Sequence, residues 1–165
     1  GAYGSEISEK YEDFTVANVI CETALKLTDT EPATSQYLLL VGALRSLAKA
    51  EHGPKQILDS YLLRALAIAG WAPNFVDCTT CNEPGPHNAF YIQTGGVVCD
   101  RCLTPGAAII GKETTKLLGA LLAGEWEYVD SCDDKIKNAA SGVVTAYTQW
   151  HIDKGLKSLS HLERA

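Results

Sequence analysis

The chain lacks methionine, long apolar runs and any excess of basic residues over its 165 positions. A transmembrane helix needs roughly 20 consecutive apolar residues, and the apolar stretch at residues 65–74 is far shorter. No apolar signal segment opens the chain, so we expect a cytoplasmic protein without a membrane span. Because even an initiator methionine is missing, we also expect the sequence to be a fragment of a longer protein.

The charge balance is acidic, with 14 Lys and Arg against 20 Asp and Glu and a formal net charge of −6. Residues 1–31 hold seven of the acids and two of the bases. A surface of this sign repels a phosphate backbone. We therefore expect the chain alone to bind single-stranded DNA weakly or not at all.

Motifs for common catalytic and phosphate-binding sites are also missing. The chain contains no G-x-x-x-x-G-K-[ST], no H-E-x-x-H and no G-x-S-x-G, the patterns of P-loops, zinc proteases and serine hydrolases. No nucleophile stands beside an evident general base. We expect a protein that acts by binding and is not an enzyme.

Two C-x-x-C pairs are the strongest positive signal, and 17 residues separate them. Each pair can form a tight knuckle that directs two thiolates at one point, and the spacing matches the pattern of structural zinc sites. Residues 90–92 and 97–98 are expected to be strands joined by a turn at 93–96. The predicted ligands of one structural zinc ion are Cys78, Cys81, Cys99 and Cys102.

Other uses of these cysteines fit the sequence less well. A redox pair would need one C-x-x-C beside a βαβ pattern, and haem attachment needs a His after the second Cys. Disulfides would imply an oxidising compartment. Iron fits the same four thiolates and stays open. His87 lies between the pairs and is expected to be a solvated loop residue.

The remaining sequence has helical periodicity and predicts a mostly α fold, a helical bundle with an inserted four-cysteine zinc β-hairpin. The expected parts of this single domain are a helical part at 1–73, a zinc-finger insertion at 74–106 and a second helical part at 107–165. Helices are expected at about 5–28, 33–49, 54–70, 112–123 and 133–163, with a short segment at 125–132.

Apolar positions at steps of three and four predict which helix faces are buried. In the first helix this stripe contains Ile7, Tyr11, Phe14, Cys21 and Leu25, interrupted by Asn18. The second and third helices are expected to bury, among others, Tyr37, Leu38 and Ile68. Cys21 and Cys132 are expected to be small core residues, and the three tryptophans, Trp71, Trp126 and Trp150, core anchors.

The segment from Tyr61 to Cys102 has a leucine-rich helix that ends in Gly70-Trp71-Ala72-Pro73, then the first cysteine pair, then Gly95-Gly96-Val97-Val98 before the second pair. In this order of motifs it resembles the C-terminal part of the RecO family of bacterial DNA repair proteins. Tyr11 and residues 20–24 are similar to the first helix of that region. Residues 155–158, Gly-Leu-Lys-Ser, are similar to its C-terminal element.

This resemblance implies the helical and zinc part of a recombination mediator, without the family's N-terminal OB domain. The parent would bind RecR and single-stranded DNA-binding protein (SSB), anneal strands and help to load recombinase, as a cytoplasmic, nucleoid-associated protein. It would contact single-stranded DNA mainly through the OB domain. Two alternatives remain: a purely architectural zinc-stabilised interaction module and, less favoured, a thiol redox protein.

Basic residues that could contact nucleic acid or a partner are few. They are Arg64, Arg101, Lys154, Lys157 and Arg164. The three near the C-terminus alternate with acids, so a solvated helix face is the competing interpretation. The helix at 54–70 is where we expect a groove for a partner's acidic, aromatic tail, although Lys55 and Arg64 are its only cations.

Overall fold

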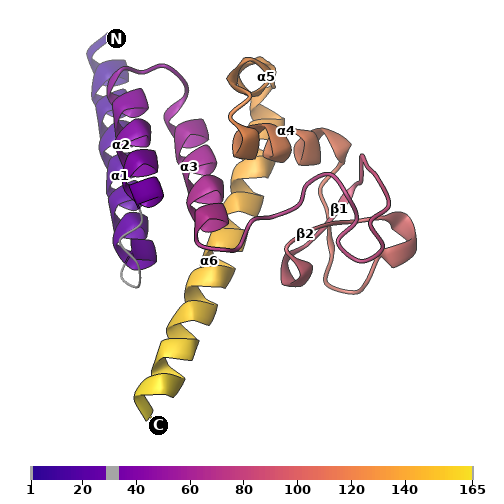
Figure 1. Ribbon diagram of the computed structural model, residues 1–165. Coiled ribbons are helices and arrows are strands. Elements are labelled where there is room, and N and C mark those ends of the chain that lie inside the picture. The colour runs from indigo at the N-terminus through magenta and orange to yellow at the C-terminus, as the bar shows by residue number, and fades with distance from the viewer. Residues whose placement is uncertain (1, 29–33, 165) are drawn as a thin grey trace.

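The computed structural model describes the backbone of residues 2–28 and 34–164, and the side chains of residues 10–27 and 34–154. Within these residues the predicted mostly helical fold is confirmed (Figure 1). The helices are α1 (Ala2–Thr28), α2 (Thr34–Ala48), α3 (Pro54–Ile68), α4 (Lys112–Ala123), α5 (Trp126–Ser131) and α6 (Asp134–Arg164). None of the helices in this part of the chain is long and apolar enough to cross a membrane.

Helix α3 lies at the centre of the bundle and contacts α1, α2, α4 and α6. Pro54 occupies its first turn, where a missing N–H costs nothing. Four consecutive residues, Ser60, Tyr61, Leu62 and Leu63, are all buried, so nearly every side of the helix faces a neighbour. The helix ends at Ile68, and Gly70 shortly after it has a φ of +101°, a conformation that glycine adopts without strain.

The second helical part wraps the other side of α3. Helix α4 buries Leu117, Leu118 and Leu121 and stops at Gly124, which has a φ of +76°. Asp133 caps α6, because its Oδ1 accepts a hydrogen bond from the N–H of Ile136 at 3.0 Å. Figure 1 shows that the C-terminal part of α6 projects beyond the bundle.

Between α3 and α4 the chain forms a small antiparallel sheet on the side of the bundle away from α1 (Figure 1). Its strands are β1 (Ala89–Tyr91), β2 (Gly96–Val98) and β3 (Ala108–Ile109), in the order β2-β1-β3. The third strand was not predicted. The expected strand residue Ile92 instead begins a 3-10 turn, Ile92–Thr94, that closes the hairpin.

Aromatic packing fixes the sheet to the bundle. Phe90 of β1 stacks with Phe75 and meets the ring of Tyr147 on α6 edge to face, both at centroid distances of 5.9 Å. The Tyr147 hydroxyl donates a hydrogen bond of 2.8 Å to the carbonyl oxygen of Trp71. Residues from three distant parts of the sequence therefore hold the sheet in one position against α6.

The predicted buried face of α1 is wrong. Tyr11, Phe14 and Leu25 are 72%, 66% and 73% exposed, and Cys21 is exposed as well; Ile7 lies outside the residues with described side chains. The opposite face, with Val16 and Ile20, is buried instead. Helix α1 carries two apolar stripes, and the one with smaller side chains packs closely against α3.

Several other residues that were predicted to be buried are exposed. Tyr37, Leu38 and Ile68 are exposed, and Trp71 and Trp150 are each partly exposed. Trp126 and Cys132 are half-buried against the core, closer to expectation. A buried polar residue, Gln36, was missed; its Nε2 donates a hydrogen bond of 2.9 Å to the Ala65 carbonyl and so joins α2 to α3.

Candidate metal centre

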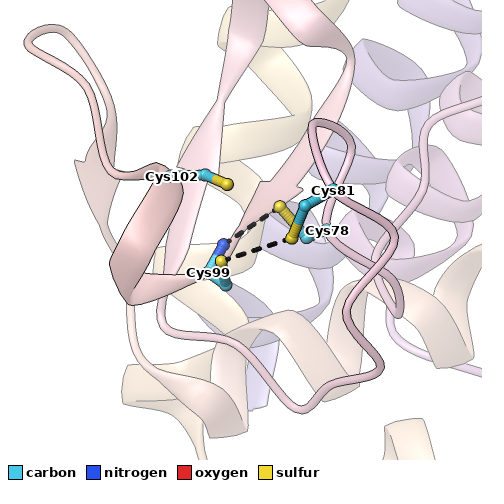
Figure 2. Close-up of side chains that lie close together, drawn as sticks. All are labelled: Cys78, Cys81, Cys99 and Cys102. Carbon is cyan, nitrogen blue, oxygen red and sulfur yellow. Dashed lines mark hydrogen bonds between the residues drawn. The ribbon is translucent and has the colours of Figure 1, made fainter.

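The four predicted ligands, Cys78, Cys81, Cys99 and Cys102, converge on one point (Figure 2). Cys78 and Cys81 lie on the loop before β1, Cys99 directly follows β2, and Cys102 ends a short 3-10 turn, Asp100–Cys102. Their sulfur atoms all lie within 4.8 Å of one another. We call residues 78–102 the cysteine module.

Local backbone geometry shapes each knuckle. In the first, the N–H of Asn82 donates to the Cys78 carbonyl and the N–H of Cys78 donates to the Glu83 carbonyl, both at 2.9 Å. Asn82 takes a left-handed conformation with φ of +65°, which asparagine tolerates. In the second, the N–H of Cys102 donates to the Cys99 carbonyl at 3.1 Å. These turns direct both thiols of a pair the same way.

The two glycines before the second knuckle are required for different structural reasons. Gly95 has a φ of +76° at the end of the hairpin turn. At Gly96 any side chain would collide with the carbonyl oxygen of Asn74, because the loop before the first knuckle runs against β2. The N–H of Thr79 donates to the Val97 carbonyl at 2.9 Å. This pairing brings the first knuckle beside the second.

The sulfur spacing suits a four-coordinate metal ion better than a disulfide. A tetrahedral zinc–thiolate site has Zn–S bonds near 2.3 Å, which places neighbouring sulfurs about 3.8 Å apart. The sulfurs of Cys81 and Cys99 are 3.7 Å apart, whereas a disulfide needs about 2.0 Å. All six cysteines are free thiols. The four cysteines are thus placed to bind one metal ion.

Electrostatics of the cluster also favour a cation. Burial raises the pKa of the Cys78 thiol, but backbone N–H groups of Cys81 and Cys99 near its sulfur outweigh burial and bring its pKa to about 6. Hydrogen bonding with the sulfurs of Cys99 and Cys81 raises the pKa of Cys102 to about 12. Four thiolates so close together repel one another, and a divalent cation removes this penalty.

His87 supports the first knuckle and is not a solvated loop residue as predicted. It is 8% exposed, and its Nε2 lies 2.7 Å from the Glu83 carbonyl oxygen. Its own carbonyl accepts a hydrogen bond of 3.0 Å from the Thr115 hydroxyl on α4. Nothing in the local sequence pattern pointed to this role, because it depends on where α4 lies.

A second site lies beside α3, where an open cleft of about 770 Å³ is lined by residues of α2 and α3 together with Leu122 of α4 and Trp126 of α5. Leu38, Leu39 and Trp126 form part of its apolar lining, Arg64 supplies a positive charge and Glu51 supplies a negative one. Arg64 is exposed. The sequence pointed to α3 for a groove but did not identify α2 and α5 as its other walls.

The other predicted basic residues come from different elements. Arg101 is on the second knuckle, with a side chain that is 78% exposed and an Nη2 atom 3.4 Å from Glu83 Oε2. Lys154 lies on α6 and is exposed. The side chains of Lys157 and Arg164 lie outside the described residues. A shared binding surface for these residues stays a prediction.

Comparison with known proteins agrees with this arrangement. The family model for the C-terminal region of recombination protein O matches residues 8–160, nearly the whole chain. The chain belongs to the RecO family. The match to RecO includes residues of both helical parts of this chain and the whole cysteine module between them.

Relatives with the printed name DNA repair protein RecO are similar over almost all of the chain. The protein of Streptomyces griseus is 45% identical over 98% of this chain and 66% of its own length. That of Nocardioides sp. is 46% identical over 93% of this chain and 65% of its own. The chain thus spans about two thirds of these RecO proteins. No solved structure matches it.

Proposed function

We propose that this chain is the C-terminal interaction region of a recombination mediator in DNA repair. It acts by binding partners and performs no catalysis. Its single domain has helical parts at 1–73 and 107–165 and a zinc-finger insertion at 74–106. The cleft beside α3 is the observation that carries this proposal, because it combines an apolar lining with an accessible arginine.

One zinc ion, held by Cys78, Cys81, Cys99 and Cys102, would stabilise the insertion. Four protein ligands close the coordination shell, so the metal would serve structure and not catalysis. Metal analysis of the purified chain should give one zinc per chain. Iron as the bound metal, or well under one metal per chain with an ordered hairpin, would contradict the assignment. Cobalt substitution should give the absorption of a tetrahedral thiolate site.

The cleft is suited to the acidic, aromatic C-terminal tail of SSB. Arg64 would pair with a carboxylate of the tail, and an aromatic side chain would enter between Leu38, Leu39 and Trp126. Arginine is well suited to this role because its guanidinium binds carboxylates in a bidentate manner.

A titration with a fluorescent SSB tail peptide tests this assignment. Arg64→Ala should weaken binding roughly tenfold or more, since it removes a charge-assisted contact of about 1.5–3 kcal/mol. The matched control is Arg45→Ala, because Arg45 is exposed on α2 and does not line the cleft. Equal affinities of both variants for the peptide would show that the tail does not bind in this cleft.

RecR would be the second partner, and strand annealing and recombinase loading would need the part of the relatives that lies outside this chain. With a net charge of −6, the chain alone would release few counterions from single-stranded DNA. Arg101, Lys154, Lys157 and Arg164 would supply the few contacts. Tight binding at physiological salt that is lost in Lys157→Glu would overturn this view. In the bacterial cell we place the protein in the cytoplasm, at the nucleoid.

A purely architectural module is the second candidate, and the acidic charge balance favours it. Such a module would hold other parts of the mediator in place without binding DNA or the tail itself. The same titrations separate the two proposals. Binding of RecR with no measurable affinity for the SSB tail would favour the architectural role.

A further inference from the structure

Trp126, which lines the cleft beside α3, is held by a histidine from another part of the chain. His52 lies in the loop between α2 and α3, and its ring stacks on that of Trp126 at a centroid distance of 4.0 Å and an interplanar angle of 8°. Its Nδ1 lies 2.8 Å from Oδ2 of Asp130. A carboxylate oxygen only accepts hydrogen bonds, so this nitrogen is the donor. Two different interactions therefore fix one imidazole against α5.

The sequence of α5 places both partners of His52 on one side of that helix. Trp126 and Asp130 are four residues apart, a spacing at which the side chains of a helix are neighbours. Helix α5 has only six residues, too few for a stable helix in isolation. Val129, which is fully buried, anchors it to the core. The contacts with His52 add a second attachment, to the loop between α2 and α3.

The loop that carries His52 has a defined conformation of its own. The N–H of Ala50 donates to the Leu47 carbonyl at 3.1 Å, and the N–H of Glu51 donates to the Ser46 carbonyl at 3.2 Å. The Ser46 hydroxyl also donates a hydrogen bond of 3.3 Å to Glu51 Oε2. These bonds tie the loop to the last turn of α2. His52 is therefore presented to α5 from a fixed position.

We propose that His52 is a positioning residue of the cleft, and that the indole ring it fixes makes the cleft select an aromatic side chain. This inference rests on the proposed function, in which a partner's acidic tail inserts an aromatic residue here. His52 covers one face of Trp126, and the ring still lines the cleft. A ring held at one angle offers the offset-stacked or edge-to-face contact that aromatic pairs prefer. The aliphatic lining at Leu38 and Leu39 gives apolar burial without that distinction.

The expected selection is modest, because one aromatic wall provides it. A well-placed aromatic pair contributes, beyond apolar burial, an amount equal to a roughly two- to tenfold change in affinity. Freeing Trp126 to rotate would lose most of this gain, since the contribution depends on the relative angle of the two rings. Burial of the ligand's apolar surface would be retained. Loss of selection with retention of binding is therefore the signature of a positioning residue.

Two peptides test the selection. One is the SSB tail peptide with phenylalanine as its aromatic residue, and the other has cyclohexylalanine there, which is similar in shape but not aromatic. The parent chain should bind the first roughly two- to tenfold more tightly in fluorescence anisotropy. His52→Ala should abolish this preference. His52→Phe should restore it, because a phenyl ring keeps the stack and loses only the hydrogen bond to Asp130.

A second histidine provides the matched control. His151 stacks on Trp71 at a centroid distance of 4.9 Å and an interplanar angle of 15°, and neither residue lines the cleft. His151→Ala thus removes a similar stack from another part of the fold. It should leave the preference for phenylalanine unchanged. Circular dichroism should show the same helical content in all of these variants.

Fluorescence quenching tests the position of Trp126 without any peptide. The chain has three tryptophans, so Trp126 is the remaining one after Trp71→Phe and Trp150→Phe. In this background, acrylamide should quench the emission of Trp126 more strongly after His52→Ala. It should not do so after His52→Phe. Unchanged quenching in His52→Ala would show that the histidine does not hold the indole in place.

The binding experiment separates failure of this inference from failure of the proposed function. A preference for phenylalanine that survives His52→Ala would overturn the role of His52. Equal affinities of the parent chain for the two peptides would overturn aromatic selection and leave tail binding intact. If neither peptide binds the parent chain, the proposed function is wrong, and the selection falls with it.

Discussion

The helical bundle and the cysteine module differ in how much buried core each of them has. The bundle has a continuous buried core that includes Ile20, Leu63, Leu118 and Val144, all of which have no exposed surface. The module has a separate cluster of four buried residues, Cys78, Ala89, Val98 and Cys99, while its Phe90 belongs to the core of the bundle. So small a cluster cannot offset the conformational entropy lost on ordering 25 residues, from 78 to 102.

This difference teaches that one chain can combine a part with enough apolar burial to fold with a part whose own buried cluster is too small to do so. Burial contributes about 25 cal/mol per Å² of apolar surface and sustains the bundle without a metal. On the proposed function, the module would gain most of its order from four metal–sulfur bonds. Experiments that unfold one part and leave the other folded therefore test how each part is stabilised.

Metal removal should have the largest effect, and only on one part. Structural zinc in small domains contributes an apparent ~10–16 kcal/mol at neutral pH. We expect a chelator to unfold residues 78–102 while most helical signal in circular dichroism remains. Cys78→Ser should act in the same direction, and Cys21→Ser is the control because Cys21 is an exposed thiol on α1. Cooperative loss of the helices on chelation would refute the separation.

Leu63→Ala should have the next largest effect, and it acts on the bundle. Leu63 is fully buried on α3, and removing such a side chain costs about 2–5 kcal/mol. Urea unfolding followed by circular dichroism should show this loss. The exposed Leu25 on α1 provides the control as Leu25→Ala, which should change stability by less than about 1 kcal/mol. Similar losses for both variants would contradict the assigned core.

Asp59→Asn should change how stability depends on pH. Asp59 is buried between α3 and α6, where the Ser141 hydroxyl donates to its Oδ2. Desolvation by burial raises its pKa from 3.8 to about 6. The protonated form therefore favours the fold, and its contribution is fully present below pH 3.8 and lost as the pH rises through about 6.

This shift corresponds to about 3 kcal/mol, which ionised Asp59 costs the fold at pH 8. An amide cannot ionise and can still accept the hydrogen bond from Ser141. Asp59→Asn should thus be more stable than the parent at pH 8 by up to about 3 kcal/mol, with little difference near pH 4. Urea titrations at both pH values measure this. A constant difference across the pH range would show that the carboxyl does not titrate there.

Arg101→Ala should have the smallest effect. The ion pair between Arg101 and Glu83 joins the two knuckles, but both side chains are exposed, and the Arg101 side chain is 78% exposed. Exposed pairs contribute about 0.2–1 kcal/mol. We expect the rate of zinc transfer to a chelator to change little. A large acceleration would mean that this pair, and not coordination alone, holds the knuckles together.

The cysteine cluster could be predicted from the sequence because its geometry is local. Two knuckles and a hairpin bring four sulfurs together within 25 residues, and the spacing alone specifies this. The bounds of α4, Lys112–Ala123, agree with the predicted range for a similar reason. Gly124 ends that helix through its own backbone conformation.

Features that depend on distant contacts could not be predicted. In α1 both apolar stripes have helical spacing, and only the positions of α2 and α3 decide which one is buried. Burial of Asp59 depends on Ser141, 82 residues away in the sequence. Strand β3 consists of two residues, Ala108–Ile109, which are too few to show the alternation of apolar and polar residues that predicts a strand.

The central position of α3 has a consequence for the order of events during synthesis. Its last residue, Ile68, leaves the ribosome 72 residues before Ala140, one of the residues through which α6 completes the core. At about 5–20 residues per second, this interval lasts roughly 4–14 s. For the first part of that time Leu63 and Leu66 have only α1 and α2 to cover them, and α4 is added before α6. The nascent chain is therefore most prone to aggregation before α6 is made.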